Sequence, residues 1–201
     1  ADIHYGLEAW RTHLIGLADA LGLDRFSIVG NSFGGALAIS MAVAQPERVD
    51  RLVLMGSCGV SFPITPGLDA VWGYEPSLET MRGLLDIFAF DRSLVTDELA
   101  RMRYAASVRP GFQESFSAMF PAPRQAGVDD LATPEDQIRG IRQPTLVVHG
   151  RDDRVIPVGN AHRLLDLIDD SQLHVFGRCG HWTQIEHAAE HFGIVTRNGA
   201  L

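Results

Sequence analysis

Cysteine and positive charge are both scarce in this sequence. Only two of its 201 residues are cysteines, Cys58 and Cys179, which is too few for a disulfide framework. We expect two reduced thiols near a core, where free cysteine is commonly buried. Lysine and arginine number 17 against 25 acidic residues, giving a formal net charge of −8. Because phosphate binding needs a basic surface, we expect no nucleic-acid partner, whereas a small anionic substrate needs only one well-placed cation.

Long hydrophobic runs are also missing. The longest apolar stretch extends from Gly34 to Ala44, far short of the roughly 18 residues that cross a bilayer, so we expect no membrane partner. No basic start followed by an apolar block and a small-residue cleavage site is visible. We therefore predict a cytoplasmic location.

The sequence does contain an alternation of helix and strand patterns. Its length allows one sizeable core plus an insertion. Apolar residues recur at helical spacing over 7–21, and a β-rich apolar run follows at 26–30. Residues 33–44 predict a buried helix, and residues 51–56 predict a second strand. Strand, helix and strand joined by short links form a βαβ unit, so we expect a parallel sheet.

The same alternation returns near the end of the chain. Residues 144–150 predict a strand entered through a proline, residues 158–168 a helix, and residues 172–177 another strand. The sheet therefore has at least four strands. We predict the α/β class, with a mostly parallel sheet and helices on both of its faces.

The segment between these two halves has a different pattern. A loop rich in proline and glycine at 63–77 precedes three helical stretches, and no strand pattern interrupts them: 78–88, 97–107 and 110–120. A helical block inserted between sheet strands predicts a cap over the strand ends. The expected organisation is a core of residues 1–58 and 141–201 with a helical cap of residues 59–140.

One motif between the first strand and its helix indicates a nucleophile. The run Gly30-Asn31-Ser32-Phe33-Gly34 matches G-x-S-x-G, a string expected by chance in about one chain in fifteen of this length. Its place at a strand-to-helix turn is what a nucleophile elbow requires. The Ser32 hydroxyl would lie at a helix N-terminus, with the Phe33 N–H as an oxyanion donor. The alternative is a glycine-rich turn with a structural serine.

A serine nucleophile needs a base and a group that orients the base, and the later strand ends supply both. Asp152 and Asp153 follow the strand that ends at Gly150, and His181 follows the next strand. We predict a triad of Ser32, Asp153 and His181. Asp152 remains an alternative for the acid.

The other histidines predict no metal centre. His149 lies inside a strand and is expected to be a hydrogen-bonded core residue. His187 and His191 have i,i+4 spacing, but no third ligand has suitable spacing. We expect neither a metal nor an organic cofactor, because the triad generates its own nucleophile.

Several segments together resemble a known family. They include GNSFGGALA, LDAVWGYEPS, RSLVTDELA, SVRPGFQESFSAMFPAPRQ, VVHGRDDRVIP and LHVFGRCGHWTQIEH. These runs are similar to the meta-cleavage product hydrolases of the α/β-hydrolase superfamily, and within them most resemble the 2-hydroxymuconic semialdehyde hydrolases. The similarity extends from about residue 5 to about residue 192 and includes the cap, which differs most between α/β-hydrolases.

The resemblance implies hydrolysis of a C–C bond in 2-hydroxy-6-oxo-hexa-2,4-dienoates during aromatic degradation. By the matching motifs, Ser32 is the nucleophile, His181 the acid/base and Asp153 its partner. The products would be a 2-hydroxypenta-2,4-dienoate and a small carboxylic acid. The resemblance leaves the substituent at C6 open, and it is compatible with a homo-oligomer, because relatives commonly associate.

The resemblance also implies substrate contacts from Asn31, Arg109 and Trp182, beside Phe33 at the elbow. An arginine can bind a substrate carboxylate in a bidentate manner. Arg109 is our candidate for this role, and its competitors are Arg101, Arg103 and Arg124. Trp182 has two interpretations, a wall of the pocket or a packed core residue.

The two ends of the sequence depart from the family pattern. Residues 1–25 contain no glycine-rich HG-type loop for a second oxyanion donor, and residues 193–201 do not continue an amphipathic last helix after Phe192. We therefore expect a fold without its N-terminal strands and with reduced activity. The alternatives to the C–C hydrolase are a carboxylesterase or lactonase on the same fold, or an inactive truncated remnant.

Overall fold

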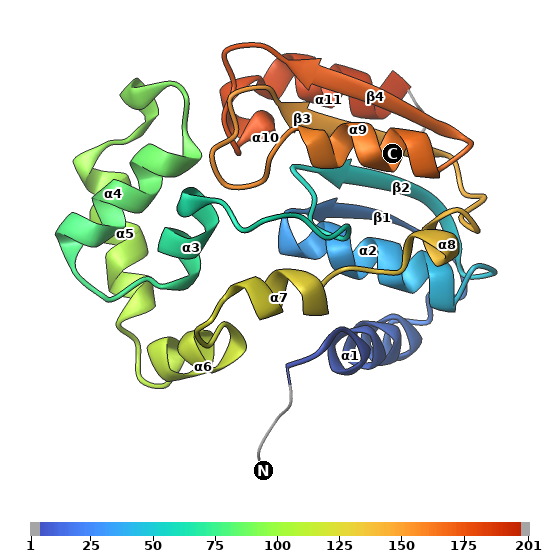
Figure 1. The fold of residues 1–201 in the computed structure, drawn as a ribbon, viewed down its shortest axis with the longest axis horizontal. Coiled ribbons are helices and arrows are strands. Elements are labelled where there is room, and N and C mark those ends of the chain that lie inside the picture. Colours follow the sequence, from blue (N-terminus) through green and yellow to red (C-terminus); the bar gives the residue numbers. More distant parts are fainter. Residues whose placement is uncertain (1–4, 198–201) are drawn as a thin grey trace.

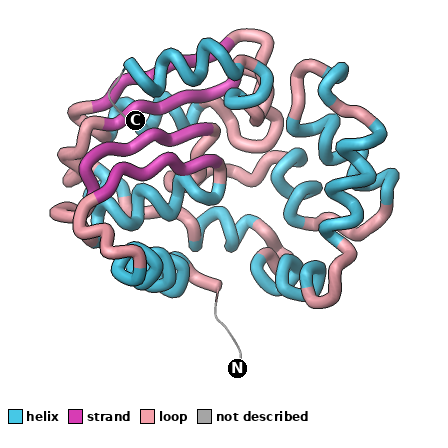
Figure 2. The backbone as a smooth tube through the Cα atoms, turned by 180° about the vertical axis from the view of Figure 1, so that it is seen from behind, coloured by secondary structure: helices cyan, strands magenta, loops and turns pink. Residues whose placement is uncertain are grey.

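The computed structural model describes residues 5–197, and its centre is a parallel sheet of four strands. The strands are β1 (Phe26–Asn31), β2 (Val49–Met55), β3 (Thr145–Gly150) and β4 (Ser171–Phe176), and they lie side by side in that order (Figure 2). In register, Gly30 pairs with Leu54, Leu54 with Val147, and Val147 with Leu173. The predicted parallel α/β sheet is confirmed.

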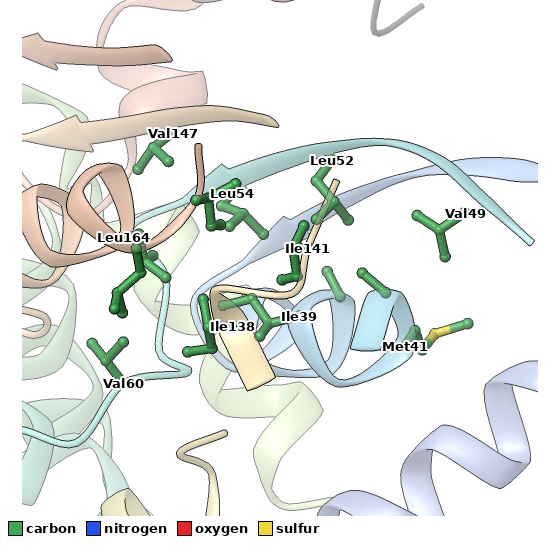
Figure 3. Close-up of a cluster of buried hydrophobic side chains, with 14 of the residues drawn as sticks. Ile39, Met41, Val49, Leu52, Leu54, Val60, Ile138, Ile141, Val147 and Leu164 are labelled. Atoms are coloured by element: carbon green, nitrogen blue, oxygen red, sulfur yellow. The ribbon is translucent and has the colours of Figure 1, made fainter. Parts of the chain in front are cut away.

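Side-chain alternation along the strands divides the core into two layers. Leu52 and Leu54 of β2 face one side of the sheet, where they join a cluster with α2 (Phe33–Ala44), α8 (Glu135–Ile138) and α9 (Gly159–Leu167) (Figure 3). Val53 and Met55 face the other side. Both faces of a parallel sheet must be covered, and accordingly β3 is buried along its whole length.

The second face and the flank of the sheet are covered by the remaining core helices. Val195 of α11 (Ala188–Arg197) packs with Val53 and Val148, and the short α10 (Thr183–Glu186) precedes it. Helix α1 (Leu7–Ala20) packs against α2 (Figure 1). We expected residues 193–201 not to continue the last helix, and this expectation is wrong for residues 193–197. Ile194 and Val195 supply the apolar face that extends α11, and residues 198–201 lie outside the described range.

Residues 59–140 form helices, and no strand occurs in this described stretch. In chain order they are α3 (Pro66–Trp72), α4 (Leu78–Phe88), a 3-10 turn (Arg92–Leu94), α5 (Asp97–Ser107), α6 (Phe112–Met119), α7 (Gln125–Asp130) and α8. Helices α3 to α6 lie beyond the carboxyl ends of the strands, whereas α8 packs beside α2 (Figure 1). Leu68 and Trp72 of α3 pack with Val155 and Ile156 of the core. This shared cluster anchors the helical block on the sheet.

Helix α3 corrects one expectation, since residues 63–77 were predicted to be a loop. Thr65 caps this helix by accepting a hydrogen bond from Leu68 N at 3.0 Å. Pro66 occupies the first turn, where its missing N–H costs nothing. No helix in the described part of the chain combines the length and the apolar character that crossing a membrane requires.

Candidate active site

Ser32 lies at a sharp turn between β1 and α2, in a backbone conformation that L residues rarely adopt (φ 55°, ψ −117°). Such conformations store strain and persist only where the surroundings enforce them. Two glycines allow this turn: a Cβ on Gly30 would lie 2.5 Å from Gly34 O, and one on Gly35 would overlap the Ser57 side chain. The local sequence therefore holds the serine at the carboxyl edge of the sheet.

Backbone hydrogen bonds attach this turn to the end of β2. Ser32 N donates to Met55 O at 2.8 Å, and Cys58 N donates to Ser32 O at 3.1 Å. The Asn31 side-chain amide also donates to Met55 O, at 3.0 Å. The position of Ser32 is thus set by two adjacent strands rather than by a flexible loop.

Asp153 lies in the loop after β3, with a carboxylate that has partners on both oxygens. Oδ1 accepts hydrogen bonds from Val155 N at 2.7 Å and Ile156 N at 3.0 Å, and Oδ2 accepts one from His181 Nδ1 at 2.7 Å. Asp152 instead contacts the Arg151 side chain at 3.3 Å and the backbone of Cys179 at 3.4 Å. Of the two candidate acids, the geometry favours Asp153.

His181 is 4% exposed and lies between the core and the cap. Its backbone N donates to Phe88 O at 2.8 Å, and its ring stacks on the Phe88 ring with centroids 5.7 Å apart. Because Nδ1 is bonded to Asp153, Nε2 is the nitrogen that remains for a reacting group.

Ser32 and His181 converge on the same end of β2. Ser32 is bonded to Met55, and a Cβ on the next residue, Gly56, would lie 3.1 Å from His181 Nδ1. Among the described residues, no hydrogen bond joins the Ser32 hydroxyl to the imidazole. Catalytic hydrogen bonds in enzymes without substrate are often long and tighten only in the complex.

Electrostatics favour an ionised acid at this point. Burial alone would raise the pKa of Asp153, but the charge of His181 and hydrogen bonds from His149 and His181 outweigh it, so that pKa lies well below its ordinary value. Burial, helped by Asp153, raises the pKa of the nearby Cys58 thiol to about 12. The Cys58 thiol is therefore neutral at physiological pH and is a poor nucleophile.

The predicted substrate contacts are divided between two places. Phe33 lies beside Ser32, with its ring edge-on to Phe120 at 6.2 Å. Trp182 is buried and stacks on Phe88 at 5.3 Å, while the Arg103 guanidinium lies 5.3 Å from the Trp182 ring. Trp182 is thus packed against Phe88, the residue that also stacks on His181.

Among the described residues, no hydrogen bond or ring contact joins Arg109 to the other predicted site residues. Its side chain is exposed between α5 and α6, with the guanidinium 6.0 Å from the ring of Phe112. Phe112 and the adjacent Pro110 line a cavity in the cap, so Arg109 is located at the margin of that cavity.

The cap cavity has a volume of about 680 Å³ and is mainly apolar. Its lining includes Tyr74, Leu84, Phe88, Arg103, Phe116 and Met119. Phe88 contributes to this lining and also stacks on His181. A cavity of this size suits a small organic ligand, and Phe88 connects its lining to the His181 ring.

Two further residues at the site were not identified from the sequence as parts of it. His149 was expected only as a core residue, yet its Nε2 lies 3.4 Å from Asp153 Oδ2. The Glu186 carboxylate accepts hydrogen bonds from Phe90 N, Asp91 N and Gly180 N, each at 2.8 Å. Glu186 thereby joins the loop that carries His181 to the end of α4. Neither contact could be predicted from the sequence, because each joins residues that lie on separate elements of the fold.

The i,i+4 histidines have an aromatic neighbour. The rings of His187 and His191 stack on Phe176, with centroids 4.6 Å and 6.5 Å apart. In the described part of the chain, no group of three His, Cys, Asp or Glu side chains is arranged to hold a metal ion.

Comparison with known proteins agrees with this geometry. A family model described as alpha/beta hydrolase fold matches residues 11–188. A 2-hydroxy-6-oxo-2,4-heptadienoate hydrolase of Pseudomonas putida is 65% identical over 184 residues, covering 92% of this chain and 67% of the relative. A 2-hydroxymuconate semialdehyde hydrolase of a Pseudomonas species is 61% identical over 195 residues, covering 97% of this chain and 69% of the relative.

A solved structure shows the same likeness in three dimensions. It is a meta-cleavage product hydrolase of Pseudomonas fluorescens, determined as a serine-to-alanine mutant complexed with acetates. It superimposes with a TM-score of 0.97 at 56% identity, covering 98% of this chain and 72% of that one. The chain thus spans about 67–72% of the length of these relatives.

Proposed function

Because this chain belongs to the α/β-hydrolase fold family and, within it, to the meta-cleavage product hydrolases, we propose that it hydrolyses a C–C bond in ring-fission products of catechols. The substrates are 2-hydroxy-6-oxo-hexa-2,4-dienoates such as 2-hydroxymuconic semialdehyde, the class named in its relatives. The observation that carries the proposal is the 2.7 Å bond between His181 Nδ1 and Asp153 Oδ2, beside the strained turn of Ser32.

We assign the three side chains the roles of a nucleophilic triad. His181 Nε2 accepts the proton of the Ser32 hydroxyl as the oxygen attacks the C6 carbonyl carbon. Asp153 holds the imidazole by Nδ1 and stabilises the imidazolium that forms. The Phe33 N–H, in the first turn of α2, is directed to the negative charge that develops on the carbonyl oxygen.

The order of steps follows from the electronic needs of C–C cleavage. The dienol first ketonises, which places a proton on C5 and a carbonyl at C2. After attack on C6, the C5–C6 bond breaks, and its electron pair is delocalised onto the C2 carbonyl. The imidazolium gives its proton to the C2 enolate oxygen, which yields a 2-hydroxypenta-2,4-dienoate as the first product and leaves His181 neutral. Water, activated by His181, then hydrolyses the acyl group on Ser32 and releases a carboxylic acid.

We propose that the substrate binds through one charged and several apolar contacts. Arg109 binds the carboxylate, since it lies at the margin of the cap cavity, and Asn31 and Trp182 contribute contacts near the reacting carbons. The apolar lining of the cavity suits the planar dienoate.

Three expectations complete the proposal. The chain acts in the cytoplasm, needs no metal or organic cofactor, and self-associates as a homo-oligomer. Among macromolecular partners we propose neither nucleic acid nor membrane, in keeping with the net charge of −8.

The direct test is hydrolysis of a coloured ring-fission product, followed as the loss of its visible absorbance. The wild type should remove the colour, and Ser32→Ala should not. Hydrolysis of neutral esters with unchanged dienoate absorbance would indicate a carboxylesterase or lactonase instead.

A fluorophosphonate supplies the second test. Intact mass should show one adduct per chain, located on Ser32. A folded sample that acquires no adduct would contradict the triad and favour an inactive remnant.

A further inference from the structure

We propose that His149 is a positioning residue that holds the Asp153 carboxylate in the orientation His181 requires. The inference rests on the proposed function, in which Asp153 is the acid partner of the base. His149 itself is not a member of the proposed triad.

His149 is fully buried in β3, and its Nε2 lies between two acceptors. Ile156 O is 3.0 Å from Nε2, and Asp153 Oδ2 is 3.4 Å from it. Because both neighbours are acceptors, Nε2 must carry the hydrogen. The Nε2–H is therefore hydrogen-bonded to the Ile156 carbonyl, and the Asp153 carboxylate lies close to the same atom.

His149 and Asp153 share Ile156 as a hydrogen-bond partner. Asp153 Oδ1 accepts from Ile156 N at 3.0 Å, and the carbonyl of the same Ile156 accepts from His149. Oδ2 faces His149 and His181 together. His149 belongs to β3, so its contacts connect the loop that contains Asp153 and Ile156 to the sheet. Loss of the ring would leave Oδ2 with His181 alone and free the Ile156 carbonyl.

Packing alone does not account for an imidazole at this position. His149 Nδ1 is buried and has no hydrogen-bond partner among the described residues. A buried polar atom without a partner costs free energy, which an apolar side chain of similar size would avoid. We therefore attribute the role of this residue to the polar contacts of Nε2.

Two thiols and one arginine also interact electrostatically with Asp153. The pKa values of the Cys58 and Cys179 thiols are both raised to about 12, mainly by burial. Arg154 remains a cation and donates to the Ala89 carbonyl at 3.1 Å. A change at His149 should therefore be expressed through Asp153 and His181.

The test compares His149→Phe with His149→Gln, whose amide N–H can take the place of Nε2–H. The rate of fluorophosphonate labelling of Ser32 is measured across pH, together with thermal unfolding. We expect His149→Phe to slow labelling roughly tenfold, the order expected for one lost hydrogen bond. The acid limb of the pH profile should move to higher pH, because Oδ2 keeps more negative charge beside His181. His149→Gln should restore both, and any loss of thermal stability in His149→Phe should be accompanied by the shifted acid limb, which a purely structural defect does not cause.

The control is His174→Phe on the neighbouring strand β4, which should label as the wild type does. An unchanged rate and profile in His149→Phe would overturn the inference. So would a rate that falls only together with stability and is not restored by glutamine, since that result indicates a structural role.

A third readout separates this inference from the proposed function. The Nδ1–H proton of His181 should give a low-field NMR resonance that disappears in His181→Gln. We expect His149→Phe to shift it, and an unshifted resonance would overturn the inference. A wild type that labels but does not hydrolyse the dienoate would contradict the proposed substrate and leave these comparisons intact. If the wild type does not label, the triad fails and the resonance alone decides the role of His149.

Discussion

The imidazole of His181 lies directly against the backbone of Gly56. A Cβ at residue 56 would be 3.1 Å from Nδ1 and 3.2 Å from Cε1 of that ring, and 3.4 Å from Asp153 Oδ2. Gly56 also has φ +48°, which is unfavourable for any side chain. The backbone just after β2 therefore forms a wall beside the His181 ring and the Asp153 carboxylate.

Gly56→Ala should displace His181 and reduce kcat about 100-fold, because a misplacement near 1 Å can cost that much. We also expect a destabilisation of about 1–3 kcal/mol from overpacking. Steady-state kinetics and urea unfolding measure the two effects.

The matched control is Gly83→Ala on the exposed face of α4, where an added Cβ meets nothing within 4 Å. It should leave kcat unchanged and stabilise the protein by about 0.5–1 kcal/mol, since alanine is the better helix former. A wild-type kcat in Gly56→Ala would show that the position of the His181 ring does not depend on contact with Gly56.

Much of the fold could be predicted because local patterns determined it. Helices at 33–44, 78–88 and 97–107 match their predicted limits, and the structure shows that Ser77 and Thr96 cap the last two. Strand β2 begins at Val49, two residues earlier than predicted, because Val49 pairs with Phe26. Pairing depends on a partner distant in sequence, which periodicity does not show.

The candidate site could be predicted only where chemistry follows strand ends. Asp153 and His181 were expected as a pair from their order after two successive strands, and the structure brings them to 2.7 Å. The alignment of His181 by Gly56 and the contact of His149 with Asp153 were not expected. Both depend on register between strands and on side-chain direction, so residue type gives no signal for them.

Two substitutions of Ser32 should separate its proposed role in catalysis from the strain of its backbone conformation. Ser32→Ala and Ser32→Gly should both lose at least about 10³-fold in kcat, as expected for a missing nucleophile. Glycine tolerates φ 55° without a Cβ penalty, so Ser32→Gly should be about 1 kcal/mol more stable than Ser32→Ala. Chemical denaturation measures the difference. Equal stabilities would indicate that the turn is not strained by its side chain.

The proposed carboxylate clamp makes Arg109 specific for charged substrates. Arg109→Gln should raise KM for the dienoate about 10–100-fold, the range expected for a lost charge-assisted hydrogen bond, and change KM for a neutral ester little. Arg103→Gln is the matched comparison, because Arg103 lines the cavity but stacks on Trp182. A selective effect in Arg103→Gln with none in Arg109→Gln would transfer the role to Arg103.

The two thiols should be unreactive in the folded protein. Burial, assisted by Asp153 at Cys58 and by Glu186 at Cys179, raises both pKa values to about 12. At pH 8 only about one thiol in 10⁴ is then ionised, and the thiolate is the reactive form. A thiol-specific disulfide reagent should modify neither residue before unfolding and both in urea. Rapid modification in native conditions would contradict this burial.

The depressed pKa of Asp153 makes its contribution to stability depend on pH. The native pKa lies below the unfolded value of about 3.9. The stabilisation is therefore complete above that pH and disappears as pH falls through the native pKa. Asp153→Asn should be clearly destabilised at pH 7, and its difference from the wild type should shrink below about pH 4, where the protonated acid resembles asparagine. Urea unfolding at several pH values measures this, with exposed Asp130→Asn as control. A difference that stays constant down to pH 3 would mean that His181 and His149 do not stabilise the ionised form.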